Sequence, residues 1–480
     1  MKAKFYILHL FVLVIILPGL NRSLAQTPVS GGIYSNTTWS LANSPYVMTG
    51  DIVVFPGVTL TIEPGVEVLV RETPTPGSEY YLETRGTINM VGQPGARILF
   101  RAENALTQVG AWSGIRVKSS QGGVLNADYV SISNAIFAYS YDGPEPPVFV
   151  FNDSEFRFNA YAVSLGTSLI ADSCTFYGNS SAISGWSVFQ ITNCEFDSNA
   201  AAMAVYPSSI SIENSVFRRN SVGINLASVP FSPMSILNSE FTDNTTAVDN
   251  AGNGIVSNCT FTGNDGGLVN TSQLNVDSCS FFENQLAVQA GFGTLVRQCI
   301  INDNEVGVAI GPLSFGQPMP IIENNQICNN AQYNVENRTD LNTFIPTNCF
   351  CITDSAAVEQ KILDGYDDIT RGLVSYAIFD TTCTNVLAIV NKVPGTTGVF
   401  EVLEDQMSVF PNPGAGPLFF DGFNENVVLR LFDSSGRQVY NHQHRTDMPW
   451  DALVGLSPGV YHLQIIRENG AMIAKRLLRL

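Results

Sequence analysis

Histidine and lysine are nearly missing from the middle of this 480-residue chain, which limits the chemistry available there. No histidine occurs within residues 10–441 to act as a base or metal ligand, and no lysine lies between Lys118 and Lys361. A polysaccharide lyase needs a base and a cation, so this composition disfavours a lyase. The cations that remain between these two lysines are Arg157, Arg218, Arg219, Arg297 and Arg338.

One pair of acids could instead serve a glycoside hydrolase, which needs two facing carboxylates at roughly 5 to 10 Å. Glu195 and Asp197 flank Phe196 and would point to the same side of an extended strand. We expect ordinary solvated surface groups here. A hydrolase or lyase that acts along the surface of the repeat is the alternative.

Three aspartates, Asp364, Asp367 and Asp368, could bind calcium through their carboxylate oxygens. Their spacing matches no known calcium loop, and aspartate is a common turn former. We therefore expect a turn on a solvated cap and no cofactor, with calcium as the alternative.

The nine cysteines fall into two groups. Five recur at one position of a repeat that serine fills elsewhere, so we expect small, buried, reduced thiols: Cys174, Cys194, Cys259, Cys279 and Cys299. The others lie beyond the regular repeat, where one or two disulfides could fasten its end: Cys328, Cys349, Cys351 and Cys383. Zinc is the alternative for this second group.

The repeat itself has a period of 20 to 24 residues. Each unit places asparagine three residues after an apolar residue: Phe156, Phe176, Phe196, Phe217, Phe241, Phe261, Phe281 and Ile301. The asparagines are Asn159, Asn179, Asn199, Asn220, Asn244, Asn264, Asn284 and Asn304. Such a unit is too short to bury a core alone, so it must stack on its neighbours.

Apolar and polar residues alternate before each aromatic, as in Phe189 and Ile191, and no segment has a helical period. This pattern predicts one coil of a parallel β-helix per repeat. We expect the trailing asparagines to adopt a left-handed backbone and to stack their amides along the helix. The glycosylation-like triplets at Asn179 and Asn244 then need no sugar.

The amino-terminal residues predict export. Lys2 and Lys4 precede an apolar run, and Ser23-Leu24-Ala25 offers small residues for cleavage, so we expect a signal peptide over residues 1–25. The net charge of −18 and pI near 4.6 argue against a nucleic-acid partner. No other apolar run is long enough for a transmembrane segment, and we expect a monomer.

The regions on either side of the repeat resemble known β-helix proteins. The stretches Gly57–Val68, Gly86–Ile88 and Trp112–Val117 resemble, in their order, the opening coils of right-handed parallel β-helices from secreted bacterial surface families. Ser355 looks like the N-cap of a helical run over Ala356–Leu363, as in the closing cap of those families. We therefore expect a β-helix over residues 26–350, with regular coils over 148–335 and an outward insertion at 140–147, and a cap over 351–383.

The carboxyl-terminal part has a different character. After an expected linker over residues 384–403, short alternating strands joined by turns predict a small antiparallel, Ig-like β-sandwich over 404–480. Its motifs resemble the type A sorting domain of the type IX secretion system, which implies export across the outer membrane of a Bacteroidota cell by that machinery. The residues that carry the resemblance are Pro411, Asn412, Pro413, Asp433, Gly436, Arg437, Gly459, Tyr461 and Lys475.

Two functional hypotheses follow. The first is a secreted or cell-surface non-catalytic protein, adhesin-like or in contact with glycans, and the second is the polysaccharide lyase or glycoside hydrolase named above. The residue pattern favours the first, because the repeat holds no histidine or lysine. Fold class alone does not choose between them.

Overall fold

The structure is a computed structural model, and it divides the chain into two compact units, residues 1–389 and 390–480, each described by itself. The expected signal peptide and linker lie outside the described residues, as do positions 143–147 of the expected insertion. In the first unit the structure describes 26–73, 75, 77–104, 107–142, 148–166, 168–226, 234–250, 252–313, 317–376 and 379–383. In the second it describes 408–410, 418–421, 426–433, 438–446, 448, 450, 455–457, 459–467 and 472–479.

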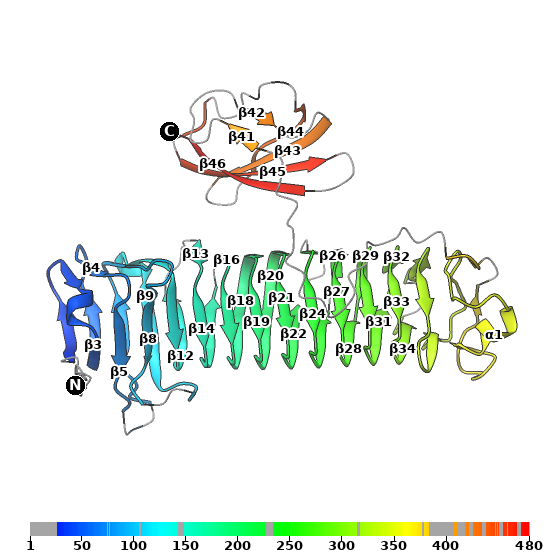
Figure 1. The fold of residues 1–480 in the computed structure, drawn as a ribbon, viewed down its shortest axis with the longest axis horizontal. Helices are drawn as coiled ribbons and strands as arrows, with labels where there is room; N and C mark the ends of the chain where they lie inside the picture. The colour runs from blue at the N-terminus through cyan, green and yellow to red at the C-terminus, as the bar shows by residue number, and fades with distance from the viewer. Residues whose placement is uncertain are drawn as a thin grey trace, which may run out of the picture. The chain divides into compact units, whose positions relative to one another are not determined.

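The first unit is the parallel β-helix that the repeat predicts, with the right-handed form that the resemblance implies (Figure 1). Its strands pair in parallel along three faces, which we call the first, second and third face. The first face holds part of β3 (Tyr46–Val54), then β5 (Glu67–Val70), β8 (Ile98–Ala102), β11 (Val130–Ser133), β14 (Glu155–Arg157), β17 (Thr175–Tyr177), β19 (Glu195–Asp197), β21 (Val216–Arg218), β24 (Glu240–Thr242), β27 (Thr260–Thr262), β30 (Ser280–Phe282), β33 (Ile300–Asn302) and β36 (Gln326–Cys328).

Thr27–Val29 of β1 (Thr27–Ile33) pairs with Tyr46–Met48 on the first face. The second face begins with the rest of β1, Gly31–Ile33, and the rest of β3. It continues through β6 (Tyr81–Thr84), β9 (Trp112–Lys118), β12 (Ala135–Asp142), β15 (Tyr161–Leu165), β18 (Ser181–Thr192), β20 (Ala201–Glu213), β22 (Val222–Leu226), β25 (Thr246–Asp249), β28 (Gly266–Val269), β31 (Leu286–Ala290), β34 (Val306–Ile310), β37 (Tyr333–Asn337) and β39 (Ile362–Leu363).

The third face shares the carboxyl-terminal parts of β18 and β20, because these two long strands run on from the second face. Its other strands are β2 (Thr37–Trp39), β4 (Thr59–Ile62), β7 (Thr87–Val91), β10 (Val124–Asp128), β13 (Phe149–Asn152), β16 (Leu169–Asp172), β23 (Met234–Leu237), β26 (Gly252–Ser257), β29 (Ser272–Asp277), β32 (Leu295–Arg297) and β35 (Ile321–Glu323). Short 3-10 turns occur at Leu41–Asn43 and Ser119–Gln121.

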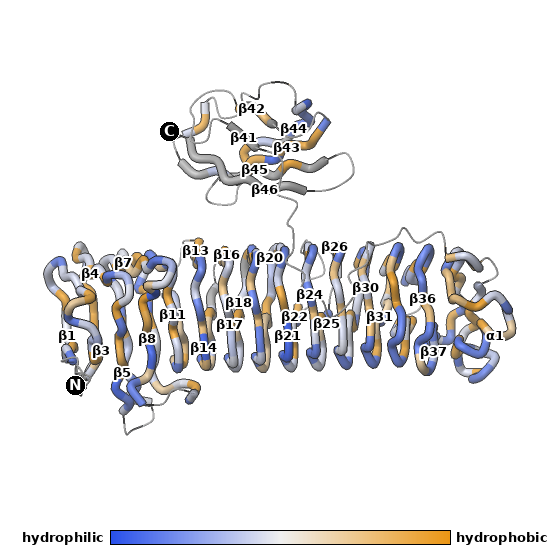
Figure 2. The backbone as a smooth tube through the Cα atoms, viewed as in Figure 1, coloured by the Kyte–Doolittle hydropathy of each residue, from blue (hydrophilic) through white to orange (hydrophobic). Residues whose placement is uncertain are grey.

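The repeated phenylalanines form one buried stack inside the first face. Each pairs in register with the next, and the ring centroids of neighbours lie 4.6 to 5.1 Å apart with nearly parallel planes. Every ring from Phe156 to Phe281 is fully buried, and Ile301 and Ile327 continue the column. Figure 2 shows the apolar and polar stretches that alternate along each coil. The predicted register and inward direction of the aromatics are therefore confirmed.

The asparagine column is a hydrogen-bonded ladder, as predicted, but the left-handed residue was assigned wrongly. Asn159 donates from both its backbone N–H and Nδ2 to Oδ1 of Asn179, at 2.9 and 3.0 Å, and this pattern recurs along the column. The positive φ angle falls one residue earlier, for example at Ser198 (58°) before Asn199. The asparagine side chain points inward, where it forms hydrogen bonds with backbone groups at the corner. The residue before it therefore adopts the left-handed conformation that the turn requires.

The closing cap differs from the expected helix. The helix α1 spans only Ser355–Glu359, and its N-cap is Asp354, whose carboxylate accepts from the N–H of Ala357. Ser355 is thus the first helical residue, and Ile362–Leu363 forms β39 on the last coil. Pairing with the coil overrides the helical pattern because it covers the end of the core. A short parallel pair, β38 (Thr343–Phe344) and β40 (Val374–Ser375), completes the cap.

The second unit is antiparallel, as predicted. Four strands pair in the order β44 (Gln438–Arg445), β43 (Asn426–Asp433), β45 (Gly459–Arg467) and β46 (Met472–Arg479), and β41 (Ser408–Phe410) pairs with β42 (Phe419–Asp421). The core of this unit, among the residues described, consists of Leu418, Val427, Leu429, Leu431, Trp450, Tyr461, Leu463 and Ile465.

Candidate functional site

The acid pair on β19 lies in an ion-pair network and is not the solvated surface that we expected. The side chain of Asp197 is only 5% exposed. Its Oδ1 accepts from Arg219 Nε at 3.0 Å and its Oδ2 from Arg218 Nε at 3.1 Å. Arg218 also pairs with Glu195, and Ser198 donates to Asp197 at 2.7 Å. Both arginines come from the next coil, and the sequence interval of 21 residues could have revealed this contact.

This network also sets the protonation of the aspartate. Burial by itself would raise the pKa of Asp197, but hydrogen bonds from Ser198, Arg219 and Arg218 outweigh that effect and hold the pKa below its ordinary value. A carboxylate that stays ionised and tied to two guanidinium groups is a poor general acid. The pair therefore fastens neighbouring coils together.

The cap aspartates hold the turn through their carboxylates. Asp364 is fully buried, and its two oxygens accept from the N–H groups of Tyr366 at 2.9 Å and Val374 at 2.6 Å. Asp368 accepts from Thr370 and Arg371, and its contacts with Thr370 first and Arg371 next lower its pKa. These hydrogen bonds give the aspartates a structural role in the turn.

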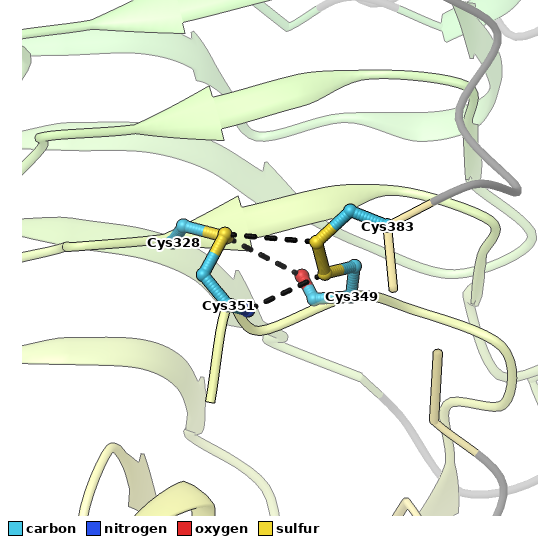
Figure 3. Close-up of side chains that lie close together, drawn as sticks. All are labelled: Cys328, Cys349, Cys351 and Cys383. Carbon is cyan, nitrogen blue, oxygen red and sulfur yellow. Dashed lines mark hydrogen bonds between the residues drawn. A yellow bond between two sulfur atoms is a disulfide. The ribbon is translucent and has the colours of Figure 1, made fainter. Parts of the chain in front are cut away.

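The four late cysteines meet at the end of the β-helix (Figure 3). Cys328 is bonded to Cys351 and Cys349 to Cys383, and all four sulfur atoms lie within 4.8 Å of one another. We expected one or two disulfides here without a pairing, and the structure has two. Zinc binds thiolates and not disulfide sulfurs, so in this oxidised form the cluster fastens the cap. It joins the last first-face strand to the segments that close the core.

The five repeat cysteines are free and buried, as predicted. Their sulfurs contact carbonyl oxygens of the preceding coil, as Cys279 does with Val256 at 3.4 Å. Burial, followed by contact with Cys259 and Cys299, raises the pKa of Cys279 well above its ordinary value. A thiol that stays protonated and inaccessible is neither a nucleophile nor a metal ligand.

A shallow hollow gathers acids at one corner of the late coils. It has a volume of about 580 Å³. No cation lines it: the lining residues are Glu283, Asn284, Gln285, Asp303, Asn304, Glu305, Ala331 and Gln332. Asn284 and Asn304 belong to the buried ladder, and Gln332 donates to Glu305. Lys361 Nζ donates to the carbonyl of Ala331, a lining residue, at 2.9 Å, so one positive charge lies at the edge of this acidic hollow.

Large aromatic side chains are exposed on the second face and at its corner with the third, which our sequence analysis missed. Trp186 is 68% and Tyr206 59% exposed, and the two are register partners on β18 and β20. Phe137 and Tyr161 stack on each other at 5.0 Å and are 37% and 41% exposed. Trp186 and Tyr206 are 20 residues apart, which is the length of one repeat. This spacing could have shown from the sequence that the two aromatics lie on neighbouring coils.

Family comparisons agree with this architecture. Residues 181–327 match the model of the right handed beta helix region, and residues 408–479 match that of the secretion system C-terminal sorting domain. The chain is a β-helix protein with a sorting domain. It is also similar to Protein bark beetle of Drosophila melanogaster, at 35% identity over 88 residues, which cover 18% of this chain and 3% of that protein.

The sorting domain indicates that the β-helix protein is exported, to the cell surface or the medium, and that it meets the type IX secretion machinery. Within the part of the chain that the structure describes, no helix is long and apolar enough to cross a membrane.

The structure places four of the predicted motif residues of the sorting domain on strands of its four-stranded sheet. Asp433 on β43 lies opposite Tyr461 on β45, and Lys475 on β46 lies opposite Leu463. Tyr461 is buried, and its hydroxyl donates to the Ser457 carbonyl at 2.8 Å. Gly459 begins β45. The predicted residues that lie outside the described ones are Pro411, Asn412, Pro413, Gly436 and Arg437.

Proposed function

We propose that this protein is a non-catalytic, adhesin-like protein whose β-helix contacts glycans outside a Bacteroidota cell. The observation that carries the non-catalytic part is the network around Asp197. Among the strands that the structure describes, only β19 carries two acids, and this network makes that pair unsuited to acid catalysis. Both carboxylates of that pair contact Arg218, and Asp197 also contacts Arg219. The outer surface of the β-helix is long and regular, which suits contact with an extended glycan.

Glu213 is the other carboxylate that merits comparison with a catalytic acid. Burial raises its pKa, as a general acid requires, although a hydrogen bond from Asn238 acts in the opposite direction. Its register partners on the third face are Thr192 and Leu237, so no second carboxylate lies level with it on the adjacent strands. A hydrolase needs such a partner, and Glu213 therefore fits a structural role better.

The test compares binding with turnover on the purified chain from residue 26 to 480. We expect binding on a glycan array, and neither new reducing ends nor unsaturated sugars after long incubation with the bound polysaccharides. Asp303→Asn, in the acidic hollow, serves as the variant for the enzymatic alternative. Product formed by the wild-type protein and lost in this variant would overturn the proposal in favour of a hydrolase or lyase.

A further inference from the structure

Among the described residues of the regular coils, the two most exposed large aromatics lie side by side at one corner. Trp186 and Tyr206 follow Gly185 and Val205 on successive coils, and their backbones pair in register. In-register parallel strands lie roughly 4.8 Å apart, so the two side chains start from adjacent levels of the same corner. Since two large rings exposed to water cost free energy, their joint exposure calls for an explanation.

The indole of Trp186 packs against a glycine of the preceding coil. A Cβ atom built on Gly166, in the preceding coil, would lie 2.6 Å from Nε1 and 3.4 Å from Cδ1 of Trp186. The ring therefore rests against bare backbone at a place where any side chain would displace it. With 68% of Trp186 exposed, the ring presents a firm surface to solvent.

The second face next to this corner carries no charge over four coils. The outward residues of β15, β18, β20 and β22 are Tyr161, Ser164, Ser181, Ser184, Ala201, Ala204, Val222 and Asn225. At the far end of β15 lies Tyr161, which stacks on Phe137 of β12 in the preceding coil. Five residues of extended strand separate the two aromatic pairs, a distance of roughly 17 Å.

We propose that Trp186 and Tyr206 form the stacking platform for a neutral polysaccharide chain, with Phe137 and Tyr161 as an extension across the second face. This inference rests on the proposed function and names its ligand class and site. The apolar C–H face of a pyranose ring packs on an aromatic ring, and serine hydroxyls between the pairs suit its hydroxyl groups.

The charge of the molecule decides between glycan classes. The chain carries a net charge of −18, and the outward positions of β15, β18, β20 and β22 on the second face hold no lysine or arginine that could pair with a uronate or sulfate. An acidic polysaccharide would thus lose long-range attraction and gain no ion pair. A neutral polysaccharide needs neither long-range attraction nor an ion pair, so this surface does not disfavour it.

Tryptophan fluorescence gives a direct probe of this site. The other three tryptophans, Trp39, Trp112 and Trp450, are buried at 4%, 0% and 2% exposure. Quenching of the native protein by acrylamide or iodide therefore reports mainly Trp186. Titration of the 26–480 chain with cellohexaose, xylohexaose, laminarihexaose and mannohexaose should, for at least one, shift the emission to the blue and protect it from quencher.

Substitutions then test the residues themselves by calorimetric titration with the hexasaccharide that binds. Trp186→Ala should weaken binding at least about tenfold, Tyr206→Ala by a similar factor, and Trp186→Leu should not restore it, because the flat ring is lost. Tyr366→Ala, at a 76% exposed tyrosine of the cap, is the matched control and should bind like wild type. Circular dichroism melts check that each variant folds.

Each outcome separates this inference from the function on which it rests. Wild-type binding that survives in both Trp186→Ala and Tyr206→Ala would overturn the platform and leave glycan contact standing. Binding of hexagalacturonate in place of every neutral probe would overturn the neutral class. Absence of binding to all glycans would overturn both proposals. Self-association in ultracentrifugation that Trp186→Ala abolishes would assign the patch to a second copy of the chain and overturn the platform.

Discussion

At the scale of single residues, Asp197 shows how a position called outward by periodicity becomes part of the structure. The residue alternates correctly with Phe196, yet two arginines of the next coil cover it and hold it ionised. A substitution there removes charge-assisted hydrogen bonds and leaves two guanidinium groups without their shared partner. Asp197 is therefore unsuitable as a neutral surface control.

We predict a pH-dependent cost for Asp197→Asn. Because the pKa of Asp197 is lower in the folded protein, its carboxylate stabilises the fold above the unfolded pKa of about 3.9, and this stabilisation disappears as pH falls through the folded pKa. Denaturation at pH 7 should show a loss of about 1 to 2 kcal/mol that largely vanishes near pH 2. Glu195→Gln, at a more exposed carboxylate, should cost less. An equal cost for Asp197→Asn at both pH values would contradict the ion-pair assignment.

The thiol column makes a second prediction at this scale. Contact with Cys194, followed by burial, raises the pKa of Cys174 well above its ordinary value, and burial does the same for Cys279. Labelling of the five repeat cysteines by iodoacetamide should be slow in the native protein and complete after unfolding in denaturant. A disulfide between any of the five, mapped by mass spectrometry in native protein, would refute the inward register.

At the scale of elements, the coils are held by columns that run through successive strands. The amide ladder satisfies backbone groups at one corner, while the phenylalanine stack fills the interior beneath the first face. Both columns bind each coil to its neighbours alone, so local damage should propagate only to adjacent coils. The column of rings continues in register even across the 24-residue repeat between Phe217 and Phe241.

Phe196→Ala tests the stack. The ring lies 4.7 Å from Phe176 and 4.6 Å from Phe217, so its removal leaves a cavity that two rigid neighbours cannot fill, at a cost of about 3 to 5 kcal/mol. Thr262→Ala, at an outward position of β27, should change stability little. Guanidinium denaturation of both variants measures the difference. Equally mild effects would show that the rings do not carry the core.

The cap is the element whose local pattern was least informative. Its helix is short, and two disulfides with a buried aspartate hold the closing segments. The bridges close segments of 23 and 34 residues in sequence separation, which restricts the unfolded chain. An exported protein can form them, since oxidising compartments favour disulfides.

At the scale of the whole molecule, the chain consists of two units that each have a core of their own. The β-helix has its own continuous core, and the sorting domain has a second core with antiparallel strands. No residue of one core is shared with the other. We therefore expect the β-helix to fold without the sorting domain.

Removal of residues 404–480 should stop export without unfolding the β-helix. A signal peptide would carry the truncated protein across the inner membrane only, so fractionation and immunoblotting should find it inside the envelope. The reverse graft, residues 404–480 on an unrelated periplasmic protein in a host with the type IX machinery, should reach the surface or medium. A truncated protein present at the surface in normal amounts would refute the sorting role.

The sequence by itself determined the repeating architecture. Aromatic, asparagine and small residues recur every 20 to 24 positions, and a unit of that length can bury its apolar residues only by stacking. The register of Phe196 and the burial of Cys279 follow from this constraint, because each is repeated in neighbouring coils. The sorting domain could also be predicted from the sequence, because several of its motifs occur in a fixed order.

Only the tertiary structure decided what happens between coils and at corners. The pairing of Asp197 with Arg218 and Arg219, the link from Cys349 to Cys383 and the support of Trp186 by Gly166 all join residues that local periodicity treats separately. Local pattern determines whether a side chain points inward or outward. What an outward side chain touches depends on the adjacent coil and on the bend of the chain at each corner, and these are set by packing of the whole solenoid.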